Sequence, residues 1–143
     1  MILLDAGALV SFLAGEPAAS EVRRILAAGD AAIPAPNLAE AIDVLVRVFG
    51  NDLGQVEAAL VPLIVTRLPV VPVGEAEARR GAAVRIAHYH RQRSPLSLAD
   101  CLLLGTAGAL GAGVATTDPP VARAARAEGL RVVALPDSTG SRP

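Results

Sequence analysis

The amino-acid sequence predicts a three-layer α/β/α fold around a central parallel sheet of about five strands. Five short apolar runs alternate along the chain with stretches of helical length, which is typical of parallel sheets covered by helices on both faces. Hydrophobic residues make up 52% of the 143 residues and aromatic residues only 2%, so aliphatic side chains must form the core. The length suits a single domain, which we expect at residues 1–136, followed by a flexible tail at residues 137–143.

The first half of the chain contains three of the predicted strands. They are expected at residues 2–5, 31–33 and 68–73. Two prolines in the third strand place it at an edge of the sheet. Four helices are expected at residues 8–14, 18–28, 37–49 and 53–67. Glycines end the first two of these helices, and Pro62 should kink or split the fourth.

The second half of the chain continues the alternation. A long polar helix is expected at residues 75–93, ended by Ser94-Pro95. The next helix opens on an S-x-x-D capping box made by Ser97 and Asp100 and ends at Gly111. The remaining elements are a strand, a helix and a last strand at residues 114–116, 121–128 and 131–135.

Composition limits the classes of function. The net charge of −1 argues against a protein that coats polyanions, and all 13 basic residues are arginine. The single cysteine, Cys101, has no internal partner for a disulfide and suits a reducing compartment. A signal peptide is not expected, because Asp5 interrupts the apolar start of the chain. The long weakly charged run at residues 98–117 is not expected to span a membrane, because it contains Asp100 and several glycines. We therefore expect a cytoplasmic protein without a membrane segment.

Four carboxylates stand at the ends of predicted elements. Asp5 ends the first strand, Glu40 opens the helix after the second strand, and Asp118 follows the fourth strand. Asp100 opens the helix that leads into the fourth strand. Sites in open parallel sheets form beyond the carboxyl ends of the strands, near a reversal of strand order. The sequence therefore predicts that these side chains meet at one edge of the sheet.

Each acid also has a simpler interpretation. Glu40, three residues after Asn37, and Asp100, three residues after Ser97, are ordinary capping-box residues. Asp118, followed by two prolines, is an ordinary N-cap. No capping pattern requires Asp5.

Charge repulsion favours a cation over four helix caps that merely happen to converge. Two carboxylates about 5 Å apart repel by about 3 kcal/mol at an effective dielectric constant of 20. The six pairs in such a cluster would cost as much as the whole stability of a domain, about 5–15 kcal/mol. Ligands that are all oxygen, with no nearby His or Cys, suit Mg²⁺ or Mn²⁺ rather than zinc. A carboxylate-held Mg²⁺ is in turn suited to phosphodiester chemistry.

Four segments resemble the acidic motifs of one known family. ILLDAGALV, NLAEAIDVL, SLADCLLLGTA and ATTD, in this order, resemble the motifs of PIN-domain nucleases, and most closely those of the VapC-type toxins of bacterial toxin–antitoxin pairs. The resemblance spans nearly the whole chain and implies a PIN-like fold. It implies that Asp5, Glu40, Asp100 and Asp118 are the metal-binding and catalytic residues, with Thr116 and Asn37 in supporting positions.

The resemblance also implies an activity and partners. The expected activity is a Mg²⁺- or Mn²⁺-dependent endoribonuclease that leaves 5′-phosphate and 3′-hydroxyl ends. The expected partners are the RNA substrate, a cognate antitoxin protein that blocks the acidic site, and a second copy of the chain in a homodimer. The chain departs from the family at Gly7, where the family usually has Ser or Thr, so a hydroxyl that would orient a carboxylate is absent.

Other interpretations remain open on the sequence. A catalytically weak or silent interaction module would keep the fold without the chemistry. An acidic-site phosphatase is disfavoured, since such enzymes use a second Asp at the position of Gly7 and a catalytic lysine, which this chain lacks. Asp43 lies one turn beyond Glu40, where it either joins the site or faces solvent. The five arginines of residues 79–93 either contact RNA or form a solvated helix face.

Overall fold

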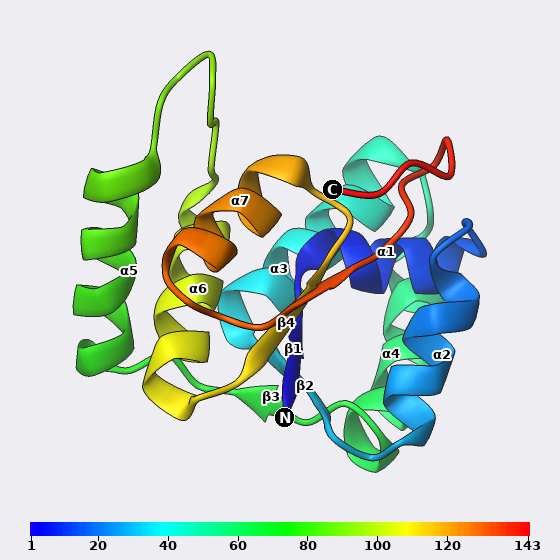
Figure 1. Ribbon diagram of the computed structural model, residues 1–143. Helices are drawn as coiled ribbons and strands as arrows, with labels where there is room; N and C mark the ends of the chain where they lie inside the picture. Colours follow the sequence, from blue (N-terminus) through cyan, green and yellow to red (C-terminus); the bar gives the residue numbers. More distant parts are fainter.

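A computed structural model describes all residues, 1–143, and contains one five-stranded parallel sheet with the strand order β3-β2-β1-β4-β5. The order shows that the chain starts in the middle of the sheet, builds outward on one side, and then crosses to build the other side. The strands are β1 (Ile2–Leu4), β2 (Ala31–Pro34), β3 (Val70–Val71), β4 (Gly113–Thr116) and β5 (Val132–Ala134). Figure 1 shows them at the centre of the molecule, covered by helices.

The predicted three-layer arrangement is confirmed by the alternation of side chains along the strands. Ile2 and Leu4 of β1 enter one hydrophobic core, whereas Leu3 enters the other. Ala115 and Val114 of β4 divide between the two cores in the same way. Because successive side chains of a strand point to opposite faces, the sheet is buried on both sides.

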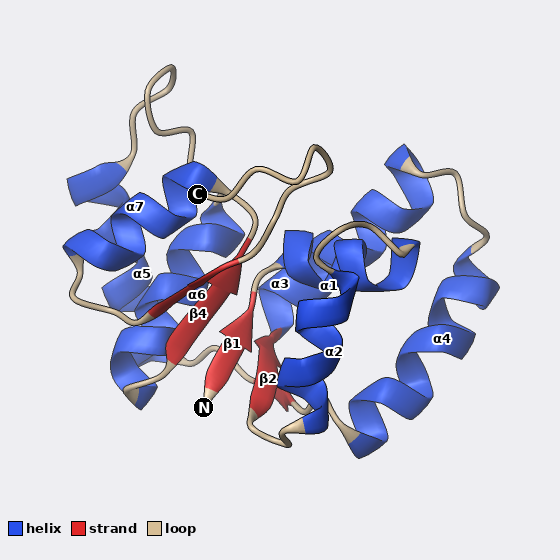
Figure 2. Ribbon diagram, turned by 45° about the vertical axis from the view of Figure 1, so that its right-hand side comes forward, coloured by secondary structure: helices blue, strands red, loops and turns tan.

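Seven α-helices and one π-helical turn, η1, cover the sheet. Figure 2 shows α1–α4 on one side of the sheet and α5–α7 on the other. The bounds are α1 (Ala6–Ala14), α2 (Ala19–Ala27), α3 (Ala35–Asp43), η1 (Val44–Val48), α4 (Leu53–Thr66), α5 (Glu75–His88), α6 (Leu98–Leu110) and α7 (Pro119–Ala127). No helix is long and apolar enough to cross a membrane.

Helices α5 and α6 touch through two glycines. A Cβ atom added at Gly105 would lie only 2.5 Å from the backbone nitrogen of Gly81. A Cβ added at Gly81 would meet the carbonyl oxygen of Cys101 at 3.0 Å. Glycine at both positions therefore lets the two backbones approach closely, and α6 is held in a fixed place against its neighbour.

Several helices differ from the sequence prediction. The third helix begins at Ala35 rather than at residue 37, because Pro34 ends β2 in an extended conformation and Pro36 favours the first turn of a helix. The fourth helix runs unbroken through Pro62. The fifth helix ends at His88 rather than at residue 93, and the chain forms a turn closed by a bridge between His90 and Ser94.

Candidate active site

The central strand β1 ends in the first of the four predicted acids. Strand order reverses between β1 and β4, where open parallel sheets form their sites. Asp5 follows β1 directly and is the N-cap of α1, with its Oδ1 accepting the backbone N–H of Ala8 at 2.6 Å. The residue is only 3% exposed. Asp5 is thus a cap as well as a candidate ligand, although no capping pattern predicted it.

Asp100 sits at the start of α6 in the predicted capping box, which is confirmed. Its Oδ2 accepts the backbone N–H of Ser97 at 2.7 Å, and the Ser97 hydroxyl accepts the N–H of Asp100 at 3.0 Å. The two bonds fix the carboxylate at the N-terminus of α6, where the helix dipole favours negative charge.

Asp118 is the N-cap residue of α7, but its carboxylate makes no capping hydrogen bond. Its backbone N–H instead donates to Thr116 Oγ1 at 2.9 Å. The Thr116 side chain, fully buried at the end of β4, also lowers the pKa of the Asp5 carboxyl, so it lies beside that acid as well. Thr116 therefore connects two of the acids and leaves the Asp118 carboxylate free to face the site.

Glu40 lies on α3, one turn after Asn37, and is partly buried. The predicted N-cap role of Asn37 is wrong, because Pro34 is the N-cap residue and Asn37 lies inside the first turn of α3. The Asn37 side chain is fully buried, and neither its amide nitrogen nor its oxygen has a hydrogen-bond partner.

The structure brings the four predicted carboxylates into one cavity. This cavity of about 230 Å³ is lined by Asp5, Glu40, Asp100 and Asp118, together with Gly7 and Thr117 among others. Four separate segments of the chain supply the acids: the residues that follow β1 and β4, the second turn of α3 and the first turn of α6. Asp43 turns away and forms an exposed ion pair with Arg47 at 2.7 Å.

The cavity raises the pKa of every acid that lines it. Burial raises the pKa of Asp5 to about 7, although hydrogen bonds from Thr116 and Ala8 oppose the rise. Burial and the nearby charge of Asp100 raise the pKa of Asp118 to about 6. The pKa values of Glu40 and Asp100 are raised as well, in both cases mainly by burial. A cation bound in the cavity would stabilise the ionised form of these carboxylates and so lower their raised pKa values.

The four carboxylates line one cavity, but they do not surround a single point as the ligands of one metal ion do. No group of three His, Cys, Asp or Glu side chains has a geometry that would hold a metal ion. Two of the four are instead engaged with backbone donors, Asp5 with Ala8 and Asp100 with Ser97.

Comparison with known families identifies the fold family. The family model described as "PIN domain" matches residues 2–127. The chain belongs to the PIN domain family. The match covers the four acids and the whole of the sheet except β5.

Solved structures of other PIN proteins share the fold. The DNA-bound VapBC of Salmonella typhimurium superposes with a TM-score of 0.67 at 21% identity, covering 92% of this chain and 96% of that chain. VapC20 of Mycobacterium tuberculosis, described as a sarcin–ricin loop cleaving toxin, gives 0.66 at 17% identity, covering 87% and 95%. FitAcB of Neisseria gonorrhoeae gives 0.64 at 24% identity, covering 92% and 96%. Among curated proteins no significant match was found.

One residue of this PIN domain's cavity was missed by the sequence interpretation. Thr117 lines the cavity, and its Oγ1 lies 2.9 Å from where a Cβ of residue 7 would be. That same Cβ position lies 3.5 Å from Asp5 Oδ1. Gly7 thus leaves a space beside Asp5 into which the Thr117 hydroxyl projects. The only signal in the sequence was the unusual glycine itself.

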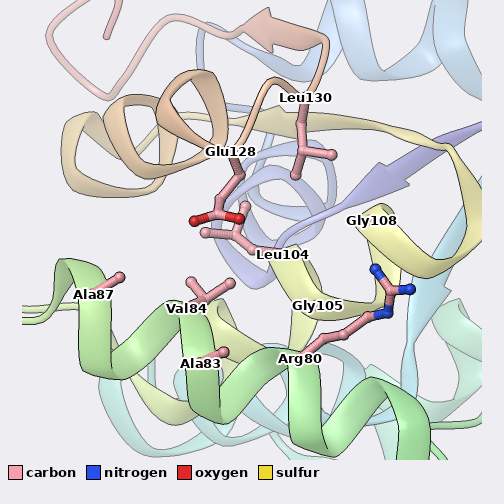
Figure 3. A pocket seen from close by; sticks show the side chains of 9 residues that line it. All are labelled: Arg80, Ala83, Val84, Ala87, Leu104, Gly105, Gly108, Glu128 and Leu130. Carbon is pink, nitrogen blue, oxygen red and sulfur yellow. The ribbon is translucent and has the colours of Figure 1, made fainter.

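A larger hollow of about 430 Å³ lies away from these acids, between α5, α6 and α7. Figure 3 shows its apolar floor, which includes Val84 and Leu104, with Arg80 and Glu128 projecting from opposite sides. Glu128 is already paired with His88 at 2.6 Å. None of the predicted site residues lines this hollow, so it is separate from the acidic cavity.

Proposed function

We propose that this PIN domain is a divalent-metal-dependent endoribonuclease and the toxin of a toxin–antitoxin pair. One observation carries the proposal: Asp5, Glu40, Asp100 and Asp118, from four separate segments, line one cavity at the reversal of strand order in a PIN fold. Its structural neighbours include VapC20, described as a sarcin–ricin loop cleaving toxin, and several toxin–antitoxin complexes. These neighbours support the same class of activity here.

The donor set of the cavity suits Mg²⁺ or Mn²⁺. All four acidic side chains offer oxygen, and no His or Cys lines the cavity. We propose Asp5 and Asp100 as the principal ligands because both are held in place by backbone hydrogen bonds. Asp118 has the free carboxylate that completes the set. A bound cation would supply polarisation of the scissile phosphate and an activated water molecule.

The protein's own groups would position the reaction and move protons. Thr116 would position both Asp5 and the backbone of Asp118, so that these two acids keep a fixed position relative to each other. Glu40 is only partly buried and its pKa is raised, which suits a carboxylate that accepts a proton from the attacking water. Helix dipoles at the starts of α1, α6 and α7 reduce the cost of gathering these charges.

We also propose a protein partner, the cognate antitoxin, and self-association into a homodimer. Exposed apolar side chains around η1 support a contact with another protein: Val48 is 63% exposed, Phe49 46% and Leu53 52%. The start of α1 is not available for such a contact, since Ala8, Leu9 and Val10 are buried in the core. A cytoplasmic location is consistent with the single free cysteine, which is buried.

Cleavage of RNA by the purified protein tests the proposed activity. The wild type is expected to cleave single-stranded RNA in Mn²⁺ and to leave 5′-phosphate ends. Asp5→Asn should lose at least about a hundredfold in rate, because removal of a metal ligand or of its orienting partner typically costs that much. Arg24→Ala, on the exposed face of α2, serves as the control and should cleave like the wild type. Equal cleavage by Asp5→Asn and the wild type would contradict the proposal, and absence of cleavage and of Mn²⁺ binding in both would favour a silent interaction module.

A further inference from the structure

The connection between α5 and α6 forms an ordered basic projection, Tyr89–Pro95, which we name the basic arm. His90 and Ser94 exchange two backbone hydrogen bonds of 2.9 Å across its base. His90 Nδ1 accepts the backbone N–H groups of Gln92 and Arg93 at 3.3 and 3.2 Å, which closes the turn. The arm is therefore a defined structure rather than the solvated helix face considered from the sequence.

The basic arm lies at the same end of the molecule as the acidic cavity. Figure 1 shows it rising beyond the ends of α5 and α6, on the side where β1 and β4 end. Two residues after the arm, Ser97 holds the Asp100 carboxylate. At the base of the arm, the fully buried Leu96 and the bond from Arg85 to its carbonyl oxygen, 2.8 Å, anchor the chain.

Arg123 connects the arm to the other side of the cavity. Its guanidinium donates to the carbonyl oxygen of Arg93 at 3.3 Å. Arg123 lies on α7, and Asp118 is the N-cap residue of the same helix. The bond from Arg123 therefore joins the arm, which precedes Ser97 and Asp100, to the helix that follows Asp118.

The arginines of the arm, and Arg123 beside it, are available for a ligand. Arg91 and Arg93 are exposed, and neither they nor Arg123 forms an ion pair with an acidic residue. Four carboxylates in the cavity would repel a nucleic-acid backbone even after one divalent cation had bound. Affinity for RNA must therefore come from cations beside the cavity, since phosphate contacts supply most of the binding free energy.

Tyr89 adds an aromatic surface at the start of the arm. It is 42% exposed, and the Arg85 guanidinium lies 4.2 Å from its ring centre on one side. Aromatic side chains next to basic groups are typical of surfaces on which unpaired bases stack. A single strand of RNA fits this combination better than a duplex, whose bases are already stacked.

We propose that the basic arm, with Arg91, Arg93 and Arg123, binds the backbone of a single RNA strand and holds it across the acidic cavity. This inference rests on the proposed nuclease function and names the surface that would position its substrate. The arm residues would bind and position RNA, while the carboxylates would perform the chemistry.

The test compares Arg91→Ala/Arg93→Ala with the matched double variant Arg23→Ala/Arg24→Ala on α2, which removes the same charge from two exposed arginines elsewhere. For the arm variant, the KM for a fluorescent single-stranded RNA is expected to rise about 10–30-fold at 0.1 M salt with kcat within about twofold. The slope of log Kd against log salt concentration, measured without metal, should fall by about 1.4, since each phosphate contact on a single strand contributes about 0.7. The control should match the wild type in both.

The outcomes separate this inference from the proposed function. If the wild type cleaves RNA and the arm variant has the KM and salt slope of the control, the inference is wrong and the nuclease function stands. A loss confined to kcat would also overturn it. If the wild type neither binds nor cleaves RNA, both are wrong. Melting temperatures of the two double variants within a few degrees of each other confirm that a changed KM reports binding rather than unfolding.

Discussion

Thr116 Oγ1 accepts the backbone N–H of Asp118 at 2.9 Å. The same side chain lowers the pKa of the Asp5 carboxyl, which lies at the end of the neighbouring strand. A single buried hydroxyl therefore lies next to both an acid that follows β1 and an acid that follows β4. This relation has consequences for both stability and metal binding.

Replacement of Thr116 by valine keeps the shape of the side chain and removes the hydroxyl. We expect Thr116→Val to lose about 1–3 kcal/mol in free energy of unfolding, because the partly buried N–H of Asp118 loses its acceptor. The pKa of Asp5 should rise further without its hydrogen bond, so Mn²⁺ binding should require a higher pH. Calorimetric titrations at several pH values measure this shift. Thr116→Ser keeps the hydroxyl and should behave like the wild type; identical pH profiles for the valine and serine variants would contradict the role of the hydroxyl.

Removal of the Asp118 charge should stabilise the metal-free protein. Burial and the Asp100 charge raise the pKa of Asp118 to about 6, so at pH 8 the carboxyl is ionised in the folded protein and its charge costs stability. Asn is as good an N-cap as Asp, and Asp118 makes no capping bond that could be lost. Asp118→Asn is therefore expected to gain about 1–2 kcal/mol in EDTA at pH 8 and to lose the additional stabilisation by Mn²⁺. Urea unfolding with and without Mn²⁺ measures both. If Asp118→Asn is less stable than the wild type in EDTA, the Asp118 charge does not destabilise the metal-free protein.

Stability and metal binding should depend on pH in opposite directions. The pKa of Asp5 is about 7 in the folded protein and 3.8 in the reference state, so between these values the folded protein holds a proton that the unfolded chain has released. Without metal, the contribution of the protonated Asp5 to the free energy of unfolding is complete below about pH 4. This contribution is lost as the pH rises through about 7. Mn²⁺ displaces this proton, so the rise in melting temperature caused by Mn²⁺ should be larger at pH 8 than at pH 5.5. A rise that is independent of pH would contradict this assignment.

A serine at position 7 should conflict with Thr117. The new Cβ would lie 2.9 Å from Thr117 Oγ1, so that the threonine side chain must rotate away from Asp5. We expect Gly7→Ser to cost about 1–3 kcal/mol, as overpacking usually does, and Thr117→Ala to recover most of that loss when combined with it. Urea unfolding of the single and double variants gives the coupling energy. Gly108→Ser, where the nearest atom is 4.0 Å from the added Cβ, is the control for added volume on a helix. Additive effects of the two substitutions would exclude the contact.

The sheet and the cavity could be predicted from the sequence because both depend on local patterns. Apolar runs marked the strands, with Asp5 directly after β1 and Asp118 two residues after the end of β4. Parallel pairing brings those strand ends to one edge, so the convergence of Asp5 with Asp118 follows from the fold class. The capping box of Ser97 and Asp100 is also local, and the structure retains both of its hydrogen bonds.

Competing local signals and contacts between distant segments account for the features that could not be predicted. The place of Asn37 inside α3 followed from the two prolines at residues 34 and 36, which competed with a good capping pattern. The end of α5 at His88 is set by tertiary contacts of the arm, such as the bond from Arg123 to Arg93, thirty residues apart. Thr117 reaches the space beside Gly7 only because β1 and β4 are neighbours in the sheet.

Metal-dependent RNA cleavage by the four carboxylates can be tested by titrating Mn²⁺ into EDTA-treated protein and measuring the rate of cleavage. We expect no cleavage without metal, a saturable rise as Mn²⁺ is added, and no cleavage by Asp100→Asn even at saturating Mn²⁺. Cleavage by the wild type in EDTA, or an Asp100→Asn variant as active as the wild type, would show that the four carboxylates are not a metal-dependent nuclease site.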